Sequence, residues 1–123
     1  MTVAEGFRDA FEKSAVSALA KLFRDDVILE MPPATIWFAG RESVTGFLAS
    51  ELLTEPGLYR LHPVAANGQP AFAAYRREPD GPYRSDSLIV VTVRGGLISR
   101  ITIFQRSRLF DLFHLPDEYP ESL

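Results

Sequence analysis

Two segments decide the fold of this chain: Met31-Pro32-Pro33-Ala34-Thr35-Ile36-Trp37-Phe38-Ala39-Gly40-Arg41 and Ala66-Asn67-Gly68-Gln69-Pro70-Ala71-Phe72. Each combines residues that restrict backbone geometry with large apolar side chains. Pro32-Pro33 ends the strand before it, because proline has no N–H to donate to a strand ladder. Asn67-Gly68 predicts a tight turn between two strands, because both residues tolerate positive φ.

The residues on the N-terminal side of Gly40 predict two helices and a strand. Apolar residues recur at helical spacing over residues 4–13, and Ser14 can cap a second helix that Asp25-Asp26 is expected to end. Apolar and polar residues then alternate over residues 27–31, which is the pattern of a strand. Gly40 begins a third helix with its own apolar face.

The residues after the third helix predict strands, over 58–66, 71–77, 85–94 and 97–106. In the strand over 85–94, Ser87, Ile89, Val91 and Val93 point one way, and Leu88, Val90 and Thr92 point the other. Both faces are largely apolar, so each needs a cover. The helices supply one, and we predict that a second subunit supplies the other in a homodimer through the sheet. The apolar cluster over residues 109–116 is expected to dock on the body. Helices followed by antiparallel strands indicate an α+β layer fold.

The composition limits the function classes. The chain has 123 residues, of which 46% are hydrophobic, so it is expected to form one domain over 1–123. It lacks cysteine and has two histidines, so no metal ion or other cofactor is predicted. Its net charge of −3 and the absence of a basic run argue against direct nucleic-acid binding. No signal peptide and no apolar run of about 20 residues is present, which predicts a soluble cytoplasmic protein without a membrane partner.

The two segments and the order of elements resemble the SnoaL-like domain of the nuclear-transport-factor-2-like (NTF2-like) superfamily, and most of all the C-terminal domain of extracytoplasmic-function (ECF) sigma factors. Residues 109–116 are similar to the family ending LF-x-x-F-G-L-P, with His114 in place of glycine. The resemblance implies an α+β cone, in which a curved antiparallel sheet wraps around three N-terminal helices and leaves a pocket. It also implies a non-catalytic domain that binds a small molecule or a protein and regulates a sigma factor in transcription, with the sigma-factor core region as a possible partner.

The same superfamily contains steroid isomerases, polyketide cyclases and dehydratases, which use an Asp or His base facing the pocket. The isomerases place this base just after the first strand, where residues 31–35 of this chain carry no carboxylate. The cyclases place an acidic residue near the end of the sheet, where this chain has Phe104-Gln105-Arg106. The alternative function is therefore a small isomerase, polyketide cyclase or hydrolase that acts on a hydrophobic ring compound with Asp86 or His62 as its base.

Asp86 and His62 each have a simpler explanation. Asp86 could be a turn residue at the start of its strand, and His62 a partly exposed strand residue. A carboxylate or imidazole deep in the pocket, opposite a hydrogen-bond donor, would favour the enzyme. A lone polar residue among apolar side chains would favour binding.

Met31, Trp37, Tyr59 and Tyr75 are predicted to bind an apolar small molecule. Trp37 is the only tryptophan and could form one wall of the pocket by stacking on the ligand. The alternative for Trp37 is core packing under the third helix. Tyr59 and Tyr75 would add hydroxyl groups to the same cavity.

Overall fold

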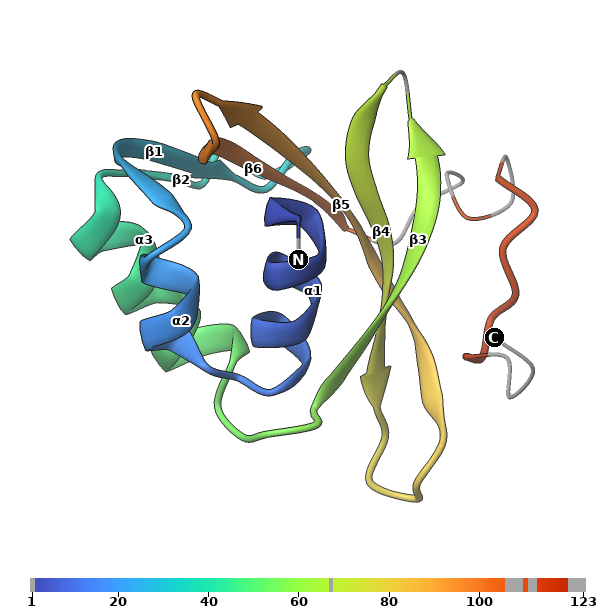
Figure 1. Cartoon of the computed structure of the whole chain (residues 1–123). Coiled ribbons are helices and arrows are strands. Elements are labelled where there is room, and N and C mark those ends of the chain that lie inside the picture. The colour runs from blue at the N-terminus through green and yellow to red at the C-terminus, as the bar shows by residue number, and fades with distance from the viewer. Residues whose placement is uncertain (1, 67, 106–109, 111–112, 120–123) are drawn as a thin grey trace.

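A curved six-stranded sheet wraps around three helices in the computed structural model, which describes residues 2–66, 68–105, 110 and 113–119 (Figure 1). The helices are α1 (Val3–Glu12), α2 (Val16–Ala20) and α3 (Arg41–Phe47), and α3 continues into the π-helical turn η1 (Leu48–Leu52). The strands are β1 (Phe23–Glu30), β2 (Trp37–Ala39), β3 (Tyr59–Ala66), β4 (Gln69–Arg77), β5 (Tyr83–Arg94) and β6 (Leu97–Gln105).

The sheet is mixed, with strand order β2-β1-β6-β5-β4-β3. Every neighbouring pair is antiparallel except β1 and β6, which run parallel. The expected curved antiparallel sheet is therefore confirmed except at this one parallel pair. The physical reason is that alternation of apolar residues reports which face of a strand is buried and says nothing about the direction of a neighbour distant in sequence.

Two local predictions also differ from the structure. α2 ends at Ala20, and Asp25-Asp26 lies exposed within an irregular part of β1, so it does not end the helix. Ser14 does not cap α2, because Ala15 occupies that position and makes no side-chain cap. The Ser14 hydroxyl instead donates to the carbonyl of Glu55 at 2.7 Å, which ties the start of α2 to the loop after η1.

Helix α1 fills the curve of the sheet, and we call the face of the sheet toward it the inner face (Figure 1). A capping box between Thr2 and Glu5 fixes its first turn. The Phe7 ring stacks on Phe72 of β4, with centroids 5.8 Å apart, and the Phe11 ring meets Tyr59 of β3 edge-on at 5.5 Å. These contacts place one end of α1 against the two strands that border the site described below.

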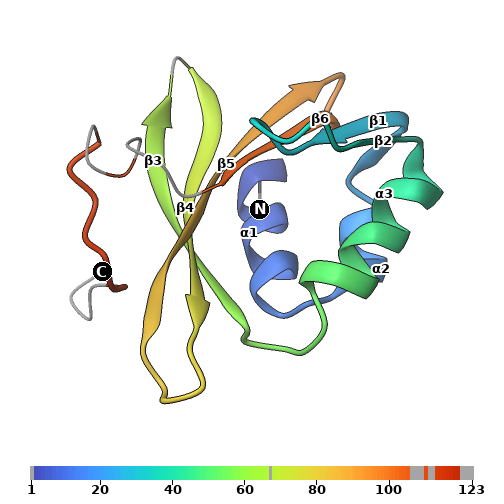
Figure 2. The ribbon, with the colours of Figure 1, turned by 180° about the vertical axis from the view of Figure 1, so that it is seen from behind.

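The opposite, outer face of the sheet carries a second apolar core. Ala73, Tyr75 and Leu88 pack there against Phe110 and the partly buried Leu115 and Tyr119 of the C-terminal segment. Figure 1 and the reverse view in Figure 2 both show this segment beyond β3 and β4, on the side away from the helices. The predicted docking of the tail is thus confirmed for its described residues, whereas residues 109, 111 and 112 lie outside the described part.

Hydrogen bonds hold the C-terminal segment in place. The Tyr75 hydroxyl donates to the carbonyl of Pro116 at 3.0 Å. The N–H of Ser85 donates to the carbonyl of Asp117 at 2.7 Å, and the N–H of Tyr119 donates to the carbonyl of Tyr83 at 2.9 Å, so the segment pairs with the start of β5. The chain therefore covers part of its own outer face, and the homodimer through that face stays a prediction.

The hairpins follow the local sequence. β3 and β4 pair from Tyr59↔Arg76 to Ala66↔Gln69, as predicted, although Asn67 lies outside the described residues. Gly95-Gly96 joins β5 to β6 at positive φ, which glycine adopts without steric cost. None of the described helices combines the length and hydropathy needed to cross a bilayer.

The outer core gives a stability prediction. Phe110 is 1% exposed and Phe113 is 38% exposed. We expect Phe110→Ala to lower the free energy of unfolding by about 3 kcal/mol, because it leaves a cavity between the tail and the sheet. Phe113→Ala is the matched control in the same segment and should cost less than about 0.5 kcal/mol. Urea denaturation measures both, and equal effects would contradict the docking of the tail.

Candidate functional site

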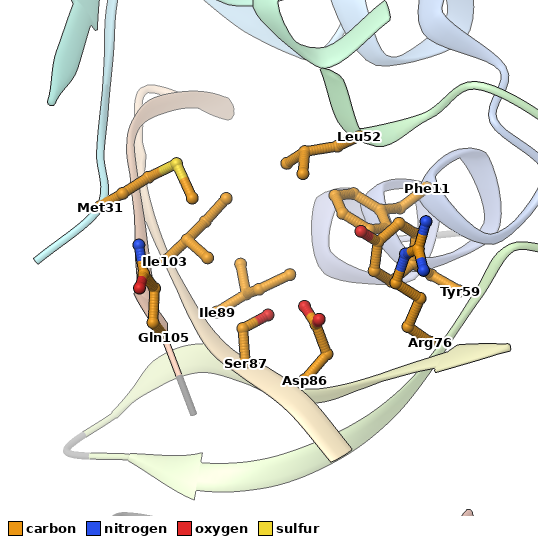
Figure 3. Close-up of a pocket in the computed structure, with 10 residues that line it drawn as sticks. All are labelled: Phe11, Met31, Leu52, Tyr59, Arg76, Asp86, Ser87, Ile89, Ile103 and Gln105. Atoms are coloured by element: carbon orange, nitrogen blue, oxygen red, sulfur yellow. The ribbon is translucent and has the colours of Figure 1, made fainter. Parts of the chain in front are cut away.

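A cavity of about 570 Å³ lies between α1, η1, the end of β1 and the inner face of β3 to β6 (Figure 3). Apolar and polar side chains share its lining. The lining residues are Phe11, Met31, Leu52, Tyr59, Arg76, Asp86, Ser87, Ile89, Ile103 and Gln105. The volume lies within the range typical of sites for small molecules.

A β-bulge in β5 builds the polar end of this cavity. Ala74 of β4 pairs with Ser87, and the next residue, Tyr75, pairs with Ser85, so Asp86 is an extra residue on β5. Side chains of consecutive strand residues normally point to opposite faces, and a bulge re-aims one of them. As a result Asp86 and Ser87, although adjacent in sequence, both point into the cavity (Figure 3).

The bulge also separates two environments along β5. On its N-terminal side, the backbone of Tyr83 and Ser85 bonds to the C-terminal segment. On its C-terminal side, Ile89 and Val91 belong to the inner core, while Leu88 belongs to the outer core.

Three functional groups meet at the polar end. Tyr59 and Arg76 are cross-strand partners on β3 and β4, and Tyr59 is 5% exposed while Arg76 is exposed at the mouth of the cavity. Asp86, half-buried, lies beside them in Figure 3. No ion pair within 4 Å joins Arg76 to Asp86 among the described residues.

The surroundings shift the pKa values of two of these groups. Burial raises the pKa of Asp86 above its ordinary value; the Ser87 hydroxyl and then the Arg76 guanidinium oppose this rise, while the charge of Glu78 adds to it. Burial, followed by the charge of Asp86, raises the pKa of Tyr59. Tyr59 therefore keeps its proton and can donate a hydrogen bond near neutral pH.

The remaining wall is apolar. Phe11 comes from α1, Ile89 from β5 and Ile103 from β6. Leu52 comes from η1, whose last turn is closed by the Leu53 N–H donating to the carbonyl of Leu48 at 2.7 Å. π-helical turns of this kind often occur at functional sites.

Met31 and Gln105 border the cavity on the side of β1 and β6. The Met31 N–H donates to the carbonyl of Ile36 at 3.2 Å, which fixes the chain after β1. Gln105 is exposed at the end of β6, and its N–H donates to the carbonyl of Pro32 at 3.5 Å. These contacts hold the Met31 thioether and the Gln105 amide at the rim of the cavity.

The structure brings three of the predicted site residues into one cavity: Met31, Tyr59 and Asp86. Trp37 does not line it, contrary to prediction, because its side chain is 63% exposed on β2, where it borders a separate shallow hollow with Glu30 and Pro32. Tyr75 is 0% exposed in the outer core, so the prediction that it adds a hydroxyl to the cavity is also wrong.

His62 does not line the cavity either. Its neighbour on β3, Leu61, packs in the inner core, and strand alternation turns His62 the other way. Burial, and then the charge of Arg8, lowers the pKa of His62. The position of His62 therefore gives no support to a role as the base in this cavity.

Seven lining residues were not among the predicted site residues, for different reasons. Phe11 and Leu52 lie on predicted helices, and Ile89 and Ile103 lie on predicted strands, but an apolar face does not reveal that it borders a cavity. Arg76 alternates with Phe72 and Ala74 of the inner core, which could have placed it on the inner face. Ser87 lies on the same face of β5 as Ile89, as strand alternation predicts, but alternation does not reveal that this face borders a cavity. Gln105 lies at a strand end.

A raised pKa has a consequence for stability. Because the pKa of Asp86 is higher in the folded chain than in the unfolded chain, the folded state holds more protons between the two values. Stability from this group is therefore greatest at low pH and falls as the pH rises through that interval. We expect Asp86→Asn, which has no carboxylate to desolvate, to be more stable than the wild type at neutral pH, with the gain vanishing in acid.

Urea denaturation between about pH 3 and about pH 8 measures this difference. Ser87→Ala is the control: it keeps the carboxylate and removes the hydroxyl that opposes the rise in the pKa of Asp86, so its pH dependence should be at least as steep as that of the wild type. An Asp86→Asn variant less stable than the wild type at neutral pH would show that the folded chain favours the charged form, against this account.

Solved structures share this architecture. A putative ketosteroid isomerase from Kribbella flavida DSM 17836 is 23% identical with a TM-score of 0.67, over 98% of this chain and 90% of that chain. An NTF2-like protein of unknown function from Burkholderia xenovorans LB400 is 12% identical with a TM-score of 0.69, over 98% of this chain and 86% of that chain. These likenesses show the fold, which is the α+β NTF2-like fold with a mixed, curved sheet.

The sequence has a relative among transcription factors. The ECF RNA polymerase sigma factor SigG of Mycobacterium tuberculosis is 35% identical over 109 residues, which are 88% of this chain and 29% of the sigma factor. The chain thus spans less than a third of the length of this relative. The sequence profile of the SnoaL-like domain matches residues 4–101. The expected family is confirmed, and the chain belongs to the SnoaL-like domain family of NTF2-like proteins.

Proposed function

We propose that this chain is a non-catalytic SnoaL-like domain that binds a small, mostly apolar molecule in the cavity between α1 and the sheet. The observation that supports this proposal is the lining itself. Apolar side chains from four different elements and the end of β1 form most of the wall, and the charged groups gather at one end. A site of this composition takes up an apolar body by desolvation and fixes its orientation through a few polar contacts.

The distribution of acid–base groups supports binding over catalysis. Asp86 is the only carboxylate among the residues that line the cavity, and His62 lies elsewhere. Met31 presents a thioether in the segment where the family isomerases carry their base. Proton transfer between two positions of a substrate needs a base aligned with the proton that it removes. Apart from Asp86, the residues that line the cavity include no carboxylate or imidazole.

The relationship to SigG supports a role in transcription. We propose that occupancy of the cavity regulates a sigma factor, with the sigma-factor core region as the partner of this domain. The homodimer through the outer face of the sheet is a separate proposal. It would leave the cavity free, because the cavity lies on the inner face.

Binding can be tested with prodan, a neutral naphthalene fluorophore whose emission shifts to the blue in apolar surroundings. We expect Met31→Arg to weaken prodan binding by about tenfold or more, because it places a charge against the apolar wall. Trp37→Arg is the matched control, since it introduces the same charged residue at an exposed position outside the cavity. The affinity of this variant for prodan should stay within about twofold of the wild type.

Thermal unfolding should confirm that both variants are folded before they are titrated. Absence of prodan binding to the wild type would contradict the proposal. Equal losses in the two variants would also contradict it, because they would place the dye outside this cavity.

One observation favours a second function, an enzyme that uses Asp86 as its base. The Asp86 carboxylate faces the same cavity as the Tyr59 hydroxyl, a hydrogen-bond donor, and burial raises the pKa of Asp86. A carboxylate that faces the same cavity as a hydrogen-bond donor is one element of general acid–base catalysis. The non-catalytic proposal predicts no isomerisation of androst-5-ene-3,17-dione above the buffer rate. If the wild type and Trp37→Arg turn over this steroid and Asp86→Asn does not, the enzymatic function replaces the non-catalytic one.

A further inference from the structure

The polar end of the cavity carries one group of each charge. The Asp86 carboxylate and the Arg76 guanidinium both line it, and the residues that the structure describes include no ion pair within 4 Å between them. Figure 3 shows the carboxylate directed into the cavity and the guanidinium beside the Tyr59 ring. A hydrogen-bond acceptor and a pair of donors therefore border the same space without satisfying each other directly.

This charge balance selects the kind of group that can bind there. A cationic amine attracted by Asp86 would be repelled by Arg76, and a carboxylate attracted by Arg76 would be repelled by Asp86. A neutral group with an N–H donor next to a carbonyl acceptor meets both partners and brings no charge of its own into the cavity. Hydrogen bonds to charged partners are about twice as strong as neutral ones, so this pairing is worth more than shape alone.

We propose that the ligand of this cavity is a neutral lactam or secondary amide on a fused-ring body, whose N–H donates to Asp86 and whose carbonyl accepts from Arg76 or Tyr59. This inference rests on the proposed function, because it names the chemical class of the molecule that the cavity binds. The amide must be cis, as in a ring, for its N–H and carbonyl to face the same side.

The apolar wall of the cavity determines which ring body the ligand can carry. Phe11, Ile89 and Ile103 line the cavity beyond the polar end, and Met31 and Leu52 close it from β1 and η1. Flat fused rings fit such a wall, because an aromatic face can lie against a phenyl ring and branched aliphatic side chains. Ser87, 4% exposed, lies next to Asp86, and its hydroxyl opposes the rise in the pKa of that carboxyl.

Two isomeric probes isolate the N–H. 4-Methyl-2-quinolone has the lactam N–H, and N-methyl-2-quinolone has the same size and carbonyl but no donor. In competition with prodan we expect the first to bind about tenfold or more tightly than the second, which is the discrimination that one hydrogen bond to a charged group supplies. 2-Naphthoate and 2-naphthylmethylammonium should both compete more weakly than 4-methyl-2-quinolone.

Variants assign the preference to the two charged side chains. Asp86→Ala should reduce the ratio between the two quinolones to within about twofold. Arg76→Met keeps an unbranched side chain and removes the donors, so it should weaken both quinolones. Arg94→Met, at the exposed far end of β5, is the control for Arg76→Met and should leave both affinities unchanged.

The possible results separate the two levels of inference. If prodan binds in the cavity but the quinolones bind equally, the lactam assignment falls and the proposed function stands. Stronger competition by either charged naphthalene also overturns the assignment, because it would show that the polar end binds an ion. If neither prodan nor any naphthalene or quinolone binds, both proposals fall.

Discussion

The β-bulge at Asp86 is the constraint on which the rest of the site depends. One extra residue in β5, opposite Ala74 and Tyr75 of β4, turns two consecutive side chains toward the helices. A bulge also bends its strand and increases the local twist. The part of β5 after the bulge can then pack its inner face against α1. The part of β5 before the bulge bonds to the C-terminal segment. The bulge in the backbone of β5 thus sets the position of Asp86.

The two apolar cores explain how the fold tolerates a desolvated carboxylate. Burial works against the charged form of Asp86, so the site reduces the stability of the folded chain near neutral pH. The inner core around Phe7 and Phe72 and the outer core around Tyr75 and Phe110 lie on opposite faces of the same strands and offset this cost. The C-terminal segment is therefore part of the structure that supports the site, although its described residues do not line the cavity.

The sequence predicted the elements that local rules control. Helical spacing placed α1, and turn-forming residues placed the hairpins β3–β4 and β5–β6. It did not predict β2, which is only three residues long, or the parallel pairing of β1 with β6, which depends on partners distant in sequence. Met31 and Asp86 were found because they flank strand ends near the pocket of the family fold. Tyr75 and Trp37 were misplaced because alternation does not say which set of residues faces inward, and because apolar size does not distinguish a cavity wall from an exposed edge strand.

The central claim is that Asp86 and Ser87 point into one ligand-binding cavity, which no regular strand allows. The chain has no cysteine, so single variants Ser85→Cys, Asp86→Cys, Ser87→Cys and Leu88→Cys each carry one thiol. The rate of thiol alkylation in each variant, with and without saturating prodan, tests the claim directly. We predict that prodan slows alkylation at positions 86 and 87 and leaves positions 85 and 88 unchanged. Protection that alternates along the strand, at 86 and 88 or at 85 and 87, would contradict the bulge and the site built on it.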